Sequence, residues 1–167
     1  MKKIICLVRH GETDQNKAKK IQGRTDFLLN DFGRHQASQA GIFLNKQNIN
    51  FDMIVSSPLS RAFETAYIIR KEINSNLEII KNPAFIERDF GVAEGLDVNQ
   101  ENFVKVLDDS YEKMEKSYEI QNRVYNGLLD LVQNTNATNI LIVCHSHTIK
   151  ALLSKLDSTR TFMDPLC

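Results

Sequence analysis

The sequence predicts an α/β protein with three layers, in which helices cover both faces of a mostly parallel central sheet. Two observations lead to this fold class. Short runs rich in Ile, Val and Leu have the length of buried strands, and the segments between them show helical periodicity. Strands that alternate with helices along a chain favour parallel pairing. A length of 167 residues is typical of one domain, so we expect residues 1–167 to form a single unit.

The expected strands are residues 4–8, 52–56 and 139–144, with residues 78–81 as a weaker fourth candidate. The expected helices are residues 33–44, 60–73, 100–119 and 121–132, and a segment after Ser146. The second helix shows the pattern clearly, because Ala62, Ala66, Ile69 and Ile73 form one apolar stripe. We expect the charged stretch 108–116 to be a solvated helix face; the alternative is that it caps a cleft.

Polar residues follow each of the three stronger strands at the point where a helix begins. These residues are Arg9-His10-Gly11 after the first strand, 56–61 after the second and His145-Ser146-His147 after the third. In open α/β sheets, ligands bind beyond the carboxyl ends of the strands. We therefore expect Arg9, His10, Arg61 and His145 to converge at one sheet edge, where helix N-termini also favour an anion.

Two arginines and two histidines around one cleft suit a dianionic phosphoryl group. The positive charge of Arg9 disfavours protonation of His10, which keeps the imidazole nucleophilic. One histidine can attack phosphorus while the other holds an oxygen in the transition state. An acid must then protonate the leaving oxygen, and Glu87 is the candidate, with Asp89 and Glu94 as competing carboxyls.

A metal site made of His10, His145 and Glu87 is an alternative use of the same side chains. Two neighbouring arginines would repel a cation and attract an anion. We therefore expect a phosphate site with no metal.

The charge balance gives no reason to expect a nucleic acid or a membrane as partner, because 21 Lys and Arg stand against 21 Asp and Glu. The apolar runs are too short for a membrane span, and the run after Lys2 and Lys3 is too short for a secretion signal. Cys6 and Cys144 lie in strand patterns, which favours reduced core thiols. We expect a cytoplasmic protein, either a monomer or a homodimer.

Four ordered blocks resemble the histidine phosphatase superfamily, also called the phosphoglycerate mutase-like family. They are residues 7–13 with Asn16 and Gln22-Gly23, residues 56–62 with Thr65-Ala66, residues 87–95, and residues 143–145. Together they extend from residue 4 to about residue 153, which is most of the chain. Such an ordered set is far more specific than any single short motif.

The resemblance implies a role for each matching residue. His10 would be the nucleophile that forms a phosphohistidine, and Glu87 would act as general acid and then as general base. Arg9, Arg61 and His145 would bind the phosphoryl group, and Asn16 would add a hydrogen bond to it. Gln22 and Gly23 would line the substrate side. The resemblance also implies that no metal and no other cofactor is needed.

The chain departs from the family pattern in two places. His145 is usually followed by glycine, but here Ser146 and His147 follow; serine suits a helix N-terminus, so we expect Ser146 to line the substrate side. His147 could face the cleft or point outward. Only 22 residues (146–167) follow His145, and members commonly continue through another strand. This suggests a compact variant or a truncated chain, with an exposed sheet edge if a strand is missing.

The leading hypothesis is a phosphomonoesterase that hydrolyses small phosphorylated metabolites through a phosphohistidine. A phosphoglycerate mutase is the alternative within the same chemistry. Mutases carry longer segments that exclude water, and the segment after Gly95 and the tail are modest here, which favours hydrolysis. A non-catalytic module that binds phosphorylated ligands is the alternative from another class. The presence of His10, Glu87 and both arginines argues against it.

Overall fold

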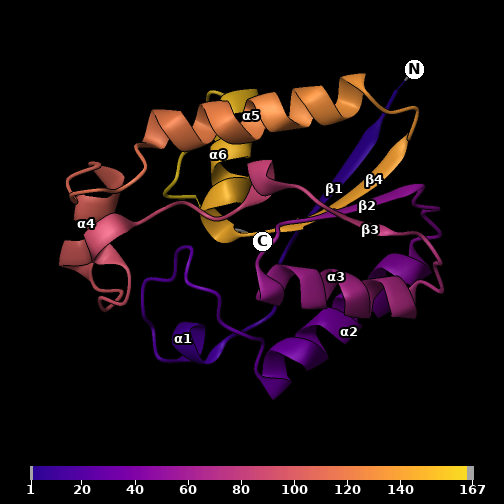
Figure 1. Cartoon of the computed structure of the whole chain (residues 1–167), viewed down its shortest axis with the longest axis horizontal. Coiled ribbons are helices and arrows are strands. Elements are labelled where there is room, and N and C mark those ends of the chain that lie inside the picture. The colour runs from indigo at the N-terminus through magenta and orange to yellow at the C-terminus, as the bar shows by residue number, and fades with distance from the viewer. Residues whose placement is uncertain (1, 165–167) are drawn as a thin grey trace.

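The central sheet has four parallel strands in the order β1-β4-β2-β3, in a computed structural model that describes residues 2–164 (Figure 1). The strands are β1 (Ile4–Arg9), β2 (Met53–Ser56), β3 (Ile79–Lys81) and β4 (Asn139–Cys144). The α-helices are α1 (Asp14–Lys17), α2 (Asp31–Lys46), α3 (Ser60–Glu72), α4 (Gln100–Leu107), α5 (Ser117–Gln133) and α6 (Ser146–Leu156). Two short 3₁₀ turns cover Pro83–Phe85 and Gly91–Ala93.

Helices cover both faces of the sheet, which confirms the predicted α/β class. Helices α5 and α6 lie on one face, and α2 and α3 lie on the other (Figure 1). Side chains of the inner strand β4 alternate between the two cores: Ile140, Ile142 and Cys144 face α5 and α6, whereas Leu141 and Val143 face α3. Because both faces of β4 are buried, its sequence is apolar without interruption.

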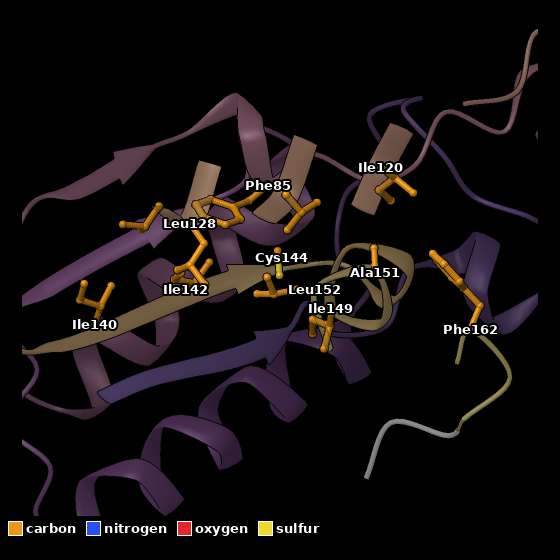
Figure 2. Packing of buried hydrophobic residues seen from close by; sticks show 12 residues of the cluster. Phe85, Ile120, Leu128, Ile140, Ile142, Cys144, Ile149, Ala151, Leu152 and Phe162 are labelled. Atoms are coloured by element: carbon orange, nitrogen blue, oxygen red, sulfur yellow. The ribbon is translucent and has the colours of Figure 1, made fainter. Parts of the chain in front are cut away.

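The core between the sheet and α5–α6 is the larger one and reaches the end of the described chain. Figure 2 shows Phe85 and Leu128 above β4, and Leu152 below them on α6. Phe162 belongs to the same buried cluster, so the segment after α6 packs back onto the fold. Cys144 is buried in this cluster and Cys6 is partly buried on β1; both are free thiols.

Close backbone packing sets the loop after β1 against α2. A Cβ on Gly11 would collide with the carbonyl of Gly33, and a Cβ on Gly33 would collide with the carbonyl of Glu12. The side chain of Asn30 accepts a hydrogen bond from Gly33 N (2.8 Å) and caps the start of α2. Only glycine permits this approach, which places His10 beside the helices α2 and α3.

The expected continuous helix over residues 100–119 is wrong, and so is the expected solvated helix face over 108–116. Helix α4 ends at Leu107, and α5 does not begin until Ser117. Between them, Asp109 and Lys113 have positive φ angles of 56° and 57°, which no helix contains. The segment is irregular because its carboxylates turn inward to meet buried cations.

Asp109 is one of these carboxylates. It forms an ion pair with the guanidinium of Arg88, whose side chain is fully buried. It also accepts hydrogen bonds from Ser117 N (2.9 Å) and Ser117 Oγ (2.8 Å) and so caps the start of α5. A buried guanidinium needs such a partner, because an unpaired buried charge is strongly unfavourable.

We predict that Asp109→Asn lowers the free energy of unfolding by about 2 kcal/mol, because it leaves Arg88 without its counter-charge. Urea denaturation at pH 7 measures this. Asp108→Asn is the matched control, since Asp108 is exposed and makes no side-chain hydrogen bond within residues 2–164. Equal stability of the two variants would contradict a structural role for the Asp109–Arg88 pair.

Candidate active site

The candidate site lies beyond the carboxyl ends of β1, β4 and β2, where parallel register brings three polar segments together. Backbone hydrogen bonds continue past the strand ends, from His10 N to Cys144 O (3.0 Å) and from Ser57 N to Val143 O (2.9 Å). These bonds hold the residues after each strand side by side. The histidine after β1, the serine after β2 and the histidine after β4 therefore meet at one edge of the sheet.

His10 is held in a single tautomer. Its Nδ1 lies 2.7 Å from the carbonyl oxygen of Gly11, which can only accept, so Nδ1 carries the proton. Nε2 is then the unprotonated nitrogen, and it accepts a hydrogen bond from Arg61 Nε at 3.3 Å. Burial and, next, the positive charge of Arg61 lower the pKa of His10 to about 3. At neutral pH the Nε2 lone pair is available as a nucleophile.

Arg61 projects from the first turn of α3, and its side chain is fully buried. Its Nη2 donates to Gly23 O (2.6 Å) and its Nη1 donates to Thr25 O (3.0 Å). The amide of Gln22, turned so that its oxygen faces the guanidinium, accepts from Nη1 and Nε at 3.1 Å each. These neutral acceptors fix the guanidinium plane without neutralising its charge, so the charge remains available to an anion.

His145 is fully buried beside His10. The two rings meet edge to face with their centroids 5.0 Å apart and an angle of 61° between their planes. His145 Nε2 lies 2.7 Å from Ser57 Oγ, and its Nδ1 has no hydrogen-bond partner within residues 2–164. Burial lowers the pKa of His145 well below its ordinary value. If the Ser57 hydroxyl donates to Nε2, an Nδ1–H is free to bind an oxygen of a ligand.

Glu87 lies between the two 3₁₀ turns, and its buried carboxyl contacts the first turn of α6. Its Oε1 accepts from Arg88 N (2.9 Å), Thr148 N (3.1 Å) and Thr148 Oγ1 (3.3 Å), and its Oε2 accepts from His147 N (3.3 Å). Burial raises the pKa of Glu87, while these hydrogen bonds and the charge of Arg61 oppose the rise. A carboxyl with a raised pKa can hold a proton and release it to a leaving oxygen.

Two cavities meet at His10. The larger, about 620 Å³, is lined by Arg9, His10, Gly11, Glu12, Asn16, Lys19, Lys20, Gln36, Ala37, Ala40, Thr65 and Val98. The smaller, about 250 Å³, is lined by Arg9, His10, Asn16, Lys20, Ile21, Gln22, Glu87, Phe90, Val98, Phe103, Val106, Ser146 and His147. Arg9 is exposed and lines both cavities, and its side chain makes no hydrogen bond or ion pair within residues 2–164.

Of the remaining residues predicted to bind substrate, three line a cavity and one does not. Asn16 lines both cavities, while its side-chain oxygen accepts from Thr13 N (3.2 Å) at the start of α1. Ser146 and Gln22 line the smaller cavity. Gly23 lines neither; its carbonyl anchors Arg61, and a Cβ at this position would crowd Glu94 Oε2 at 2.9 Å and Phe90 at 3.1 Å.

The two competing carboxyls, Asp89 and Glu94, line neither cavity. Asp89 accepts from Gly91 N (2.9 Å), and Glu94 accepts from Thr25 N (2.9 Å), so both stabilise loops. His147, which could have pointed outward, instead lines the smaller cavity between Phe90 and Phe162, with ring centroids 5.0 and 5.3 Å away.

Sequence reasoning missed three side chains that support the site. Ser57 holds His145, Thr148 holds Glu87, and Thr65 Oγ1 accepts from Gly11 N (3.1 Å) in the loop that carries His10. Ser57 and Thr65 lie inside the second block of the resemblance, so their positions gave some signal. Thr148 gave none, because a threonine in the first turn of a helix is ordinary.

Comparison with known proteins gives the family. The family model described as the histidine phosphatase superfamily (branch 1) matches residues 5–161. The chain belongs to this superfamily. An uncharacterized phosphatase PhoE of Bacillus subtilis is 40% identical over 152 residues, which are 91% of this chain and 76% of that protein. A 2,3-bisphosphoglycerate-dependent phosphoglycerate mutase of Methylorubrum populi is 28% identical over 175 residues, covering 96% of this chain and 82% of that protein.

Two similar solved structures have the same fold. Bacillus stearothermophilus YhfR superimposes with a TM-score of 0.85 at 25% identity, over 97% of this chain and 84% of that one. A phosphoserine phosphatase of Entamoeba histolytica, in complex with 3-phosphoglyceric acid, gives 0.74 at 34% identity, over 91% and 78%. Within residues 2–164, no three His, Cys, Asp or Glu side chains gather as metal ligands. No helix in this range is both long and apolar enough to cross a bilayer.

We predict that His147 makes stability depend on pH. Burial and, next, the charge of Arg88 lower its pKa from 6.5 to about 3, so the unfolded chain binds a proton in this window that the folded chain does not. Stability therefore falls as pH falls below 6.5, by about 1–2 kcal/mol from pH 7 to pH 5 for this residue. His147→Phe fills the same space between two phenylalanine rings and should remove that part of the loss.

The measurement is urea denaturation of the wild type and the variant at pH 7 and pH 5. His35→Gln is the control, because His35 is exposed on α2 and should leave the pH dependence unchanged. If His147→Phe loses as much stability as the wild type between the two pH values, His147 is not the residue responsible.

Proposed function

We propose that this protein is a phosphomonoesterase that hydrolyses small phosphorylated metabolites through a phosphohistidine on His10, with Glu87 as general acid and then general base. One observation supports it above all. An imidazole with an unprotonated Nε2 lies against the buried guanidinium of Arg61, and a buried carboxyl lines the same cavity. A nucleophile, an anion-binding charge and a proton donor around one cavity are the three parts that phosphoryl transfer requires.

In the first step, Arg9, Arg61 and His145 bind the phosphoryl oxygens, with Asn16 at the cavity wall. His10 Nε2 attacks phosphorus in line with the ester oxygen, the P–O bond breaks, and Glu87 gives its proton to that oxygen. The leaving group departs as an alcohol, and the phosphoryl group stays on Nε2. Positive charge from the two guanidiniums stabilises the charge on the equatorial oxygens in the transition state.

In the second step, the Glu87 carboxylate removes a proton from water as the water oxygen attacks phosphorus. The P–N bond breaks, its electron pair returns to Nε2, and inorganic phosphate leaves. Nδ1 remains bound to the Gly11 carbonyl throughout, so His10 returns to the same tautomer for the next cycle. Glu87 ends protonated, as it began.

Hydrolysis is favoured over mutase chemistry by the comparison with relatives. The phosphatase of Bacillus subtilis is 40% identical over 91% of the chain, against 28% over 96% for the mutase of Methylorubrum populi. Incubation with 3-phosphoglycerate separates the two: a phosphatase releases inorganic phosphate, and a mutase forms the 2-isomer. Isomer formation faster than phosphate release would overturn the proposal. A protein that binds phosphate but neither turns over an ester nor becomes phosphorylated would be a binding module.

The size and lining of the cavities support a small-molecule substrate. The larger cavity carries Lys19 and Lys20, and the smaller one carries Ile21, Phe90, Phe103 and Val106. A panel of sugar phosphates, phosphorylated acids, nucleotides and aryl phosphates, ranked by kcat/KM, identifies the preferred organic group. A phosphoprotein preferred over every small ester would contradict this part of the proposal.

We predict that His10→Ala abolishes turnover but still binds inorganic phosphate, because Arg9, Arg61 and His145 remain. Wild-type protein quenched during turnover of a ³²P-labelled ester should carry acid-labile phosphate, and His10→Ala should carry none. Isothermal titration with phosphate measures the binding. Retained turnover in His10→Ala would remove His10 from the role of nucleophile.

We predict that Glu87→Gln slows hydrolysis of an alkyl phosphate about 10²- to 10⁴-fold, because a poor leaving group needs protonation. With p-nitrophenyl phosphate the first step needs no acid, so the variant should release one equivalent of nitrophenol rapidly and then stall at the phosphohistidine. Stopped-flow absorbance records the burst. Equal losses with both esters and no burst would mean that Glu87 acts only on structure.

A further inference from the structure

The carboxylate of Glu115 lies at the centre of a cluster of cations behind Glu87. Its Oε1 accepts from Arg123 Nε (2.7 Å), and its Oε2 accepts from Arg123 Nη2 (2.8 Å) and Arg24 Nη2 (3.3 Å). Its side chain is 11% exposed, against 23% for Arg123 and 38% for Arg24. The two parallel bonds to Arg123 form a bidentate pair, the strongest geometry for these groups.

Both arginines bind the main chain on which Glu87 stands. Arg123 Nη1 donates to Ala84 O (2.8 Å) and Ile86 O (3.0 Å), and Arg123 Nη2 lies 3.5 Å from Glu87 O. Arg24 Nε donates to the same Glu87 carbonyl at 3.2 Å. The carbonyls on and before Glu87 are therefore held by two guanidiniums that share one carboxylate.

Glu115 also holds the main chain after Glu87. Its backbone N donates to Asp89 O (2.8 Å), its Oε2 accepts from Asp89 N (3.3 Å), and its carbonyl accepts from Arg88 Nε (2.8 Å). The segment 84–89 is thus fixed on both sides of Glu87. An isolated surface ion pair contributes little, but the Glu115 carboxylate at the centre of this network is only 11% exposed and every member has several partners.

We propose that Glu115 is a positioning residue: through Arg24 and Arg123 it fixes the segment that carries Glu87, and it balances the two positive charges behind that carboxyl. This inference rests on the proposed role of Glu87 as general acid. Without Glu115, the Arg123 guanidinium would lose its carboxylate partner, and Arg24 would keep only the carboxylate of Asp89 at 3.5 Å. The positive charge near Glu87 would then be less balanced and would favour its ionised form. Glu87 would then lose its catalytic proton at a lower pH.

The other charged or titratable groups around Glu87 would stay unchanged. They are Arg9 and His10 after β1, Lys20 after α1, Arg61 on α3, Arg88 next in sequence, Asp89 after it, Cys144 at the end of β4, His145, and His147 and Lys150 on α6. The charge of Arg123 already reaches this site, because it contributes to lowering the pKa of His145. A change at Glu115 therefore alters the electrostatic field at Glu87 only from the side of Arg24 and Arg123.

The test compares pH profiles of kcat/KM for an alkyl phosphate. In Glu115→Gln the alkaline limb, where the acid loses its proton, should move to lower pH by roughly half a unit or more. In Arg24→Gln one cation is removed, so the same limb should move to higher pH. The loss of kcat in Glu115→Gln should be at least tenfold larger for the alkyl ester than for the burst with p-nitrophenyl phosphate, which needs no acid.

Glu112→Gln is the matched control. It makes the same change of charge three residues away, at an exposed side chain that has no hydrogen bond or ion pair within residues 2–164, and its profile should match the wild type. Thermal unfolding of each variant checks folding, and Arg24→Gln carries the test if Glu115→Gln does not fold.

A folded Glu115→Gln with lower stability but a wild-type profile and leaving-group dependence would show a purely structural role. A shift of the Glu115→Gln and Arg24→Gln profiles in the same direction would also overturn the charge argument. If the wild type hydrolyses no ester, the proposed function fails, and this inference fails with it. Activity in the wild type with unchanged variants overturns the inference alone.

Discussion

The burial of the Arg61 guanidinium against a neutral histidine is the interaction on which the site depends. A cation this deep is stable only when its donors are occupied. The carbonyls of Gly23 and Thr25 accept two of them, and His10 Nε2 accepts a third. These contacts join the loop after α1, the start of α3 and the end of β1. Because the acceptors are neutral, the positive charge is kept for a ligand.

On the opposite side of the cavity, the buried carboxyl likewise has its hydrogen-bonding atoms occupied. Glu87 is buried, and the first N–H groups of α6 satisfy its oxygens. Its backbone is held by arginines that Glu115 in turn holds, so an irregular segment has a fixed position. A neutral imidazole and a carboxyl of raised pKa therefore share a cavity with Arg9, whose side chain has no partner among the described residues. The site is set up for an anion before any ligand arrives.

The strands and most of the site could be predicted because their signals are local. The apolar run of β4 and the polar residues after it are consecutive in sequence, and parallel pairing alone brings His10 and His145 together. The prediction of one helix over residues 100–119 was wrong for the opposite reason. Residues 108–116 have helical composition, but the desolvation of Arg88 and Arg123 draws Asp109 and Glu115 inward and breaks the helix. Arg88 lies 21 residues from the Asp109 carboxylate, and Arg123 lies 8 residues from the Glu115 carboxylate.

The sequence by itself determined the α/β class, the family and the polar residues that meet beyond the strand ends, because each depends on short motifs and on periodicity. Tertiary structure alone decided how those residues behave. It set the tautomer of His10, left Gly23 outside both cavities with its carbonyl on Arg61, placed His147 in the smaller cavity and made Glu115 the centre of the arginines behind Glu87. Burial and distance control all four, and both arise only when segments far apart in the chain come together.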